Sequence, residues 1–243
     1  MGRKIAIRLQ HRRRREGKTD FRLRLALIKS RRLRFVARKS LNNITCSFVQ
    51  HRIEGDAALV SADSKELKAY GWKVNGGNLP ASYLTGFLAG IRAKQAGIKE
   101  AVFDMGLARA TKGNRLFAAL KGAIDSGLEI SCKDAVLPES DRISGRHIAS
   151  YAEHVKRKDS GLYTSMFSSY LKNAIQPENL PEHFETAKKY IIETGALKGR
   201  KDLARTETKK TGKKQTEQKP EAAKKAGKVT HSMREKKGAE NQK

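Results

Sequence analysis

Residues 78–105 read NLPASYLTGFLAGIRAKQAGIKEAVFDM, and this stretch carries the strongest information on the fold. Asn78 can cap a helix that has Pro80 in its first turn and ends at Gly97. Apolar residues recur inside this helix at the spacing of one buried stripe: Leu84, Phe87, Leu88 and Ile91. The apolar run 101–105 has the length of a short buried strand. A helix that leads directly into such a strand favours an α/β fold.

The same pattern repeats on the C-terminal side. Residues 106–114 are typical of a loop, and residues 115–126 predict a second helix that stops at Gly127. Its inward positions are Leu116, Ala119, Leu120 and Ala123. Residues 129–130 can add a last short strand. Alternating strands and helices imply parallel pairing, because parallel neighbours need a long crossover, usually a helix.

On the N-terminal side the period changes to that of strands. Residues 33–39 and 44–49 alternate between apolar and polar side chains, and Asn42-Asn43 between them is a hairpin signal. Residues 57–62 follow another turn as a third strand. One face of this meander is apolar, and the other carries Arg34, Arg38, Thr45 and Ser47. We predict an α/β body with a mixed sheet, in which this antiparallel meander joins parallel strands and packs with helices.

Composition divides the chain into four regions. Residues 1–20 form an extended basic arm, because its run of four arginines has no apolar stripe to bury. Residues 21–135 form the α/β body, and residues 136–195 form a helical C-terminal extension. Residues 196–243 form a Lys-rich tail with almost no large apolar residue, which we expect to be flexible on its own.

Helix signals also occur at the start of the body and in the extension. Thr19 or Asp20 can cap a helix that runs to Lys29. Its apolar side is expected to contain Phe21, Leu25 and Ile28. In the extension, one helix is predicted over 144–158 and a last one over 180–195.

The net charge of the 243 residues is +27, so the expected partner is a polyanion. Residues 1–39 hold 16 Lys or Arg against 2 acidic residues, residues 196–243 hold 16 against 6, and residues 40–195 hold 20 against 17. Two basic arms therefore flank a nearly neutral body. No apolar run approaches the roughly 20 residues that span a bilayer, and arginines interrupt any N-terminal signal segment. We expect no membrane partner and a cytoplasmic location.

The sequence gives little support for a metal site or for an enzyme. Cys46 and Cys132 lack the paired spacing of zinc ligands, and the loop with Lys112-Gly113 lacks the order of a phosphate-binding loop. A metal-dependent nuclease would need clustered carboxylates, and the candidates lie in separate segments: Asp104, Asp125, Asp134 and Asp141. We expect no cofactor, no small-molecule substrate and no catalysis. A DNA-packaging protein would explain the Lys-rich tail but not the motifs below.

Several segments resemble one protein family in their order and spacing. They are RRREGKTDF at 13–21, VARKS at 36–40, YGW at 70–72, GNLPASYLTG at 77–86, AVFDMGL at 101–107, FAALKGA at 117–123, GRHIASY at 145–151 and LPEHF at 180–184. Together they resemble the 5S-RNA-binding ribosomal proteins, number eighteen of the large subunit in bacteria and archaea and number five in eukaryotes. The archaeal long form fits best.

The resemblance covers about residues 12–195. It implies the ribonuclease-H-like arrangement of translational components, without nuclease activity. It also implies that the partners are 5S rRNA, large-subunit rRNA and neighbouring large-subunit proteins in the central protuberance. Two features depart from the family pattern. Arg31-Arg32-Leu33 stand where the family often has Gly-Lys-Pro, and the Lys-rich tail has no counterpart in the usual archaeal form.

The expected RNA-binding residues lie mainly in the arm and on the polar sheet face. Arg is favoured for forked phosphate contacts, and aromatic or Arg planes can stack on unstacked bases. The set is Arg3, Lys4, Arg8, Arg12, Arg13, Arg14, Arg15, Lys18, Phe21, Arg22, Arg24, Arg31, Arg32, Arg34, Arg38, Lys39, Ser40, Asn42, Asn43, Thr45, Ser47, Trp72 and Arg146. A place in the core is an equally good interpretation for Trp72 and for Tyr83. The polar sheet face has the alternative of being simply solvated.

Overall fold

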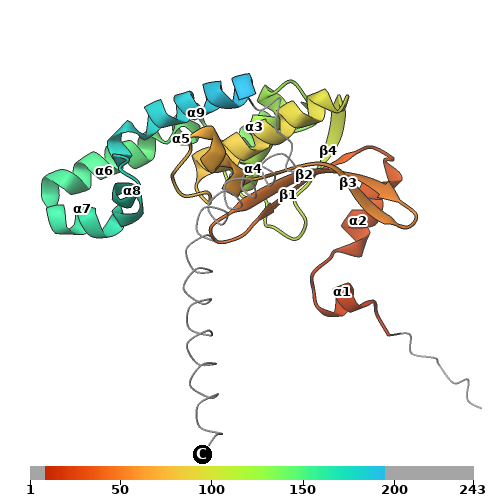
Figure 1. Ribbon diagram of the computed structural model, residues 1–243. Coiled ribbons are helices and arrows are strands. Elements are labelled where there is room, and N and C mark those ends of the chain that lie inside the picture. Colours follow the sequence, from red (N-terminus) through yellow and green to blue (C-terminus); the bar gives the residue numbers. More distant parts are fainter. Residues whose placement is uncertain (1–8, 195–243) are drawn as a thin grey trace, which may run out of the picture. The chain divides into compact units, whose positions relative to one another are not determined.

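A computed structural model describes residues 9–194 of the chain (Figure 1). Its centre is a five-stranded sheet in the order β3-β2-β1-β4-β5. The strands are β1 (Arg34–Lys39), β2 (Ile44–Arg52), β3 (Gly55–Asp63), β4 (Glu100–Asp104) and β5 (Glu129–Ile130). β1 and β3 both pair antiparallel with β2, whereas β4 pairs parallel with β1 and β5. The predicted α/β class with a mixed sheet is confirmed.

The meander follows the alternation expected from the sequence. Phe35 of β1 lies opposite Phe48 of β2, both are fully buried, and their ring centroids are 4.9 Å apart. β2 and β3 run beyond their predicted ends, because only a two-residue turn separates them and the ladder continues to Arg52 opposite Gly55. Most apolar side chains therefore share one face of the sheet, and the other face carries the polar ones together with Val36 and Val49.

Two helices cover the apolar face, α3 (Leu79–Gln95) and α4 (Arg115–Asp125) (Figure 1). Asn78 and Asn114 cap them, because their side-chain oxygens accept backbone N–H bonds from the first turns. α3 is buried nearly all round, not only along the predicted stripe. Glycine makes this possible, since a Cβ on Gly86 would collide with the carbonyl oxygen of Ala119 in α4. The two helices thus approach each other more closely than larger residues would allow.

The N-terminal elements are α1 (Arg12–Arg15) and α2 (Phe21–Lys29). Asp20 caps α2, as predicted, by accepting two backbone N–H bonds. The expected inward position of Leu25 is wrong, because Leu25 is 55% exposed and Leu27 is half-buried instead. Arg24 lies on the side of α2 that faces the sheet, where its Nη2 is 2.9 Å from Asp56 Oδ2 of β3.

Short connections complete the body. The 3₁₀ helix η1 (Ser64–Tyr70) links β3 to α3 and places Leu67 and Tyr70 in the core. Its N-terminus has a reciprocal cap between Asp63 and Glu66. A second 3₁₀ helix, η2 (Asp134–Val136), follows β5.

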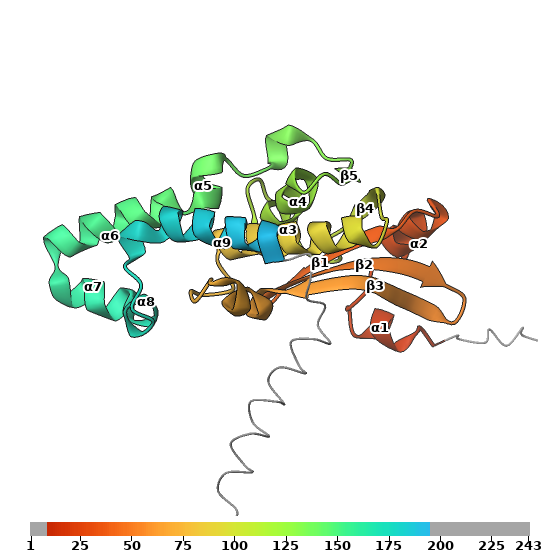
Figure 2. The same ribbon diagram turned by 45° about the horizontal axis from the view of Figure 1, so that its top comes forward.

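The C-terminal extension contains α5 (Ser140–Ser144), α6 (Arg146–Lys158), α7 (Ser160–Met166), α8 (Ser168–Lys172), η3 (Pro177–Asn179) and α9 (Leu180–Thr194). The helix predicted over 144–158 is confirmed as α6, which begins at Arg146 because Gly145, with a left-handed φ of 86°, separates it from α5. α9 runs beside α3 in both views and buries Leu180, Phe184 and Ile191 in the main core (Figures 1 and 2). α6 and α7 share a smaller core of Ala152, Val155, Tyr163 and Phe167.

Candidate nucleic-acid interface

The N-terminal basic segment contains a single helical turn. α1 consists of four arginines, none of them buried. The arm was expected to be extended, but two backbone N–H groups of this turn donate to the carbonyl oxygen of His11 and close it. Arg13 Nε donates to Thr19 Oγ1 at 2.8 Å, and Lys18 Nζ lies 2.9 Å from Glu16 Oε2. Exposed pairs of this kind hold little energy, so the cations can exchange these partners for phosphates.

α2 carries the basic surface toward the sheet. Arg22 is exposed, whereas Arg24 Nη2 lies 2.9 Å from Asp56 Oδ2. Phe21 is half-buried, and its ring centroid lies 6.1 Å from that of His11. Arg24 and Phe21 are therefore partly engaged within the protein, and Arg22 presents its charge to solvent.

Two exposed cations, Arg31 and Arg32, occupy the connection from α2 to β1. Arg31 has φ 55°, in the left-handed region that favours glycine. The turn before β1 therefore holds a residue other than glycine in a strained conformation. Arg32 Nε lies 3.9 Å from Glu100 Oε2 at an exposed site.

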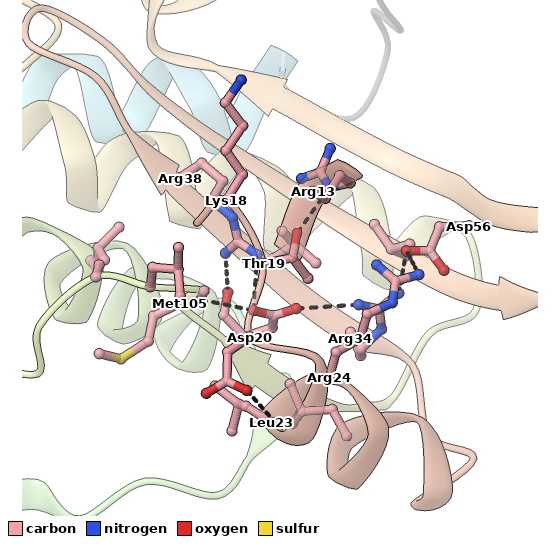
Figure 3. A pocket seen from close by; sticks show the side chains of 18 of the residues that line it. Arg13, Lys18, Thr19, Asp20, Leu23, Arg24, Arg34, Arg38, Asp56 and Met105 are labelled. Atoms are coloured by element: carbon pink, nitrogen blue, oxygen red, sulfur yellow. Dashed lines mark hydrogen bonds and ion pairs between the residues drawn. The ribbon is translucent and has the colours of Figure 1, made fainter. Parts of the chain in front are cut away.

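On the outer face of the sheet, an ion network surrounds Arg34 (Figure 3). Arg34 is only 3% exposed, with Nη2 2.7 Å from Asp56 Oδ2 and Nη1 3.2 Å from Asp104 Oδ2. Arg38 Nη2 lies 2.9 Å from the other oxygen of Asp104, Oδ1. The expectation that Arg34 offers its guanidinium to RNA is therefore corrected, because two carboxylates already enclose it.

This network changes the titration of Asp56. Partial burial works to raise the pKa of its carboxyl group. Hydrogen bonds from Arg34 and His51, together with the charges of Arg34 and Arg24, outweigh burial and lower that pKa below its usual value. Asp56 is thus a carboxylate throughout the neutral range, and it neutralises part of the positive charge on this face.

The connection between β1 and β2 is closed by its own side chains. Ser40 Oγ accepts the N–H of Asn43 at 3.0 Å and donates to the carbonyl oxygen of the same residue, also at 3.0 Å. Thr45 Oγ1 donates to Asp63 Oδ2 at 3.1 Å. The other predicted contacts here are exposed or half-buried: Lys39, Asn42 and Ser47. The hairpin is therefore a fixed surface feature beside the end of β1.

A hollow of about 460 Å³ lies between the N-terminal segment, the outer sheet face and the loop after β4 (Figure 3). It gathers six of the predicted cations: Arg13, Lys18, Arg24, Arg34, Arg38 and Lys39. Its apolar lining includes residues that sequence reasoning missed: Leu23, Leu27, Met105 and Leu107. The sequence around these four residues does not mark them as binding residues. The N-terminal segment and the loop after β4 come together only in the fold, through the parallel pairing of β1 with β4.

Other predicted contacts lie away from this hollow. Trp72 is 1% exposed and its Nε1 donates to the Asn75 carbonyl oxygen at 3.4 Å, so its expected stacking on a base is wrong and it is a core residue. Tyr83 is buried as well. Arg146 begins α6, pairs with Asp141 at 3.2 Å and lines a separate hollow of about 380 Å³. Arg3, Lys4, Arg8 and the Lys-rich tail lie outside the described residues.

Three of the four carboxylates considered for nuclease chemistry have side-chain partners in the protein. Asp104 belongs to the Arg34 network, Asp125 accepts a 2.8 Å hydrogen bond from the Tyr83 hydroxyl group, and Asp141 pairs with Arg146. Within residues 9–194, no group of three or more His, Cys, Asp or Glu side chains could hold a metal ion. Over the same range, no helix is long and apolar enough to cross a bilayer.

The arginine-rich segment leads onto a charged face of the sheet. Such a surface is typical of an α/β protein that binds nucleic acid. A family model described as ribosomal large subunit proteins 60S L5 and 50S L18 matches residues 6–99 and 93–133. The large ribosomal subunit protein uL18 of Methanococcus maripaludis is 50% identical over 186 residues, which are 76% of this chain and 96% of that protein. The chain therefore belongs to the uL18 family of large-subunit ribosomal proteins, which confirms the resemblance seen in the sequence.

Family membership settles the broad function. The chain is an archaeal-type structural constituent of the large ribosomal subunit, with ribosomal RNA as its partner, and it acts in translation. Proteins of this family are not enzymes, and the predicted absence of catalysis follows from that membership. The chain is located on the ribosome in the cytoplasm.

Proposed function

We propose that the chain binds 5S rRNA and helps to anchor it to the large-subunit rRNA in the central protuberance. The observation that carries this proposal is the row of exposed cations that runs from α1 over α2 to the end of β1. Such cations release counterions when they neutralise phosphates, which supplies affinity for any RNA. Neighbouring large-subunit proteins are proposed as further partners.

The chemistry of the hollow supports specificity beyond charge. Folded RNA is recognised through its shape, its 2′-hydroxyl groups and its unstacked bases, rather than through paired bases in a deep groove. A surface with cations around an apolar hollow fits a folded RNA with unpaired nucleotides better than it fits a regular duplex. We therefore assign the outer sheet face, together with α1 and α2, to 5S rRNA.

The test compares the affinity of the full chain for 5S rRNA and for a structured control RNA of equal length. We expect clear preference for 5S rRNA at physiological salt. Changing Lys18 and Lys39 together to Ala should weaken binding to 5S rRNA more than binding to the control RNA. A matched variant with Lys158 and Lys172 changed to Ala removes the same charge from exposed positions of the extension, and it should leave the preference intact. Equal affinity of the wild type for both RNAs would reject the proposal.

A further inference from the structure

Arg38 holds its guanidinium group in one fixed plane. Nη1 donates to the carbonyl oxygens of Ala37 and Asp104 at 2.8 and 2.7 Å, and Nη2 donates to Asp104 Oδ1 at 2.9 Å. A guanidinium group has five N–H donors, so three of them are held by acceptors within the protein. The orientation of the group is therefore set before any ligand arrives.

One face of this plane is covered by Gly106. A Cβ added to Gly106 would lie 2.9 Å from Cζ of Arg38, 3.1 Å from Nη2 and 3.2 Å from Nε. If the added Cβ lay in the guanidinium plane beside its edge, it would be nearer to the two nitrogens than to Cζ. It is nearest to Cζ, so it lies above the plane. Gly106 has φ 64°, and its N–H donates to Asp104 Oδ1 at 2.9 Å, which holds the loop against the guanidinium group. The backbone at Gly106 thus covers one face of the Arg38 guanidinium group.

The rest of the Arg38 side chain faces the hollow. The Arg38 side chain is 48% exposed, and because Gly106 covers one face of the guanidinium group, we infer that the accessible part includes the opposite face. Beside it stand Met105 and Leu107, and Leu107 is 58% exposed. The volume of about 460 Å³ is in the range of pockets that accept small organic groups. Lys18 and Lys39 add two exposed cations to the lining of the same hollow.

We propose that one unpaired nucleotide of the bound RNA stacks its base on the open face of Arg38. Met105 and Leu107 border the base, and Lys18 and Lys39 neutralise the adjoining phosphates. Bases that are not stacked in RNA bind in this way to Arg planes. The inference rests on the proposed function, because it takes RNA as the ligand. It adds that Arg38 recognises an unpaired base, whereas the arginines of α1 contact phosphates.

The experiment removes single bases from the RNA and, separately, replaces the planar guanidinium group of Arg38. Each unpaired nucleotide of 5S rRNA is replaced in turn by an abasic one, which keeps the phosphate, and the affinity of the full chain is measured at fixed salt. We expect one position at which affinity falls by about tenfold, in line with the contribution of one stacked base. Arg38→Lys keeps the charge but lacks the plane, so it should weaken binding to unmodified 5S rRNA by a similar factor. Arg52→Lys, at an exposed position of β2, is the matched control and should leave affinity unchanged.

The two changes should not be independent. At the sensitive position, the abasic RNA should bind Arg38→Lys no more weakly than unmodified RNA does. If the two losses multiply at every position, or if no abasic position weakens binding of the wild type, the base does not stack on Arg38 and the inference is overturned. Neither result removes the preference of the wild type for 5S rRNA, so failure of the inference is distinguishable from failure of the proposed function. The abasic scan on the wild type needs no variant, and thermal unfolding checks that Arg38→Lys is folded.

Discussion

Nη1 of Arg34 lies 3.2 Å from Oδ2 of Asp104, although 70 positions separate the two residues in the chain. Their side chains are 4% and 8% exposed. Removing the Asp104 carboxylate takes one of two carboxylates from the buried Arg34, which keeps Asp56, and takes the carboxylate partner from Arg38. Asp104→Ala should therefore lower the free energy of unfolding by about 3–5 kcal/mol, measured by urea denaturation.

The matched control is Asp141→Ala. Asp141 pairs with Arg146 at the same 3.2 Å, but both side chains are largely exposed. The expected loss is about 1 kcal/mol or less, because solvent screens an exposed pair. Similar losses for the two variants would show that burial does not set the energy of the Arg34 pair.

The lowered pKa of Asp56 predicts a pH dependence of stability. Because its folded pKa lies below its unfolded value of about 4, Asp56 contributes stability above that pH. This contribution is lost as the pH falls through the folded pKa. Asp56→Asn should be less stable than the wild type at neutral pH, and the difference should shrink below about pH 4. Urea unfolding at a series of pH values checks this, and a constant difference from neutral to acid pH would contradict it.

The close approach of α3 and α4 predicts intolerance to one methyl group. Gly86→Ala should lower the free energy of unfolding by at least about 2 kcal/mol, because its Cβ meets the backbone of Ala119 and a helix must shift. Gly161→Ala places the same methyl group on an exposed position of α7. It should change stability by about 1 kcal/mol or less, because its nearest neighbour, Asp159 Oδ1 at 3.3 Å, belongs to a side chain that can shift. Thermal or urea unfolding of both variants measures the contrast.

The left-handed conformation of Arg31 predicts a stabilising substitution. Arg31→Gly should raise the free energy of unfolding by about 0.5–1 kcal/mol, because glycine adopts this φ without strain. Arg32→Gly loses the same charge from the neighbouring position, which has no positive φ, and should be destabilising instead. If both changes shift stability in the same direction, strain at Arg31 is not the cause.

The two basic regions predict different effects of truncation on RNA binding. Deleting residues 1–19 removes 8 Lys or Arg and should flatten the salt dependence and reduce affinity for 5S rRNA. Deleting residues 196–243 removes 16, yet we expect a smaller loss of preference for 5S rRNA, because Lys contacts phosphate as a point charge. Salt-titrated binding to 5S and control RNA measures both. Loss of preference on tail deletion alone would show that the two assignments are reversed.

The fold was predictable where a local pattern carries it. The period of apolar residues predicts α3, α4 and the meander. Asn78 is predicted as a cap, and the cap of α2 is narrowed to Thr19 or Asp20, because capping needs only neighbouring residues. The alternation in β1 also gave the face of Arg34 correctly. It could not show what covers that face, because Asp56 and Asp104 come from other strands.

The candidate site was predictable in its charge but not in its shape. Arg-rich segments pointed to RNA, whereas the hollow depends on Leu27 and Met105, which the folded chain brings together from distant segments. The error at Leu25 has a similar origin, since α2 contacts residues that are distant in the sequence, such as Asp56 of β3, which pairs with Arg24. Trp72 was ambiguous because an aromatic side chain can serve a core or a ligand equally well.

The central strand β1 acquires its two neighbours at different times during synthesis. β2 follows directly, but β4 emerges only at Glu100–Asp104, after the whole of α3. Until then, one edge of β1 has unpaired backbone groups, and such edges invite aggregation with other chains. Arg34 and Arg38 give this strand a positive charge, which discourages pairing with another copy. The strand that closes this edge also brings Asp104, whose carboxylate pairs with both arginines in the folded chain.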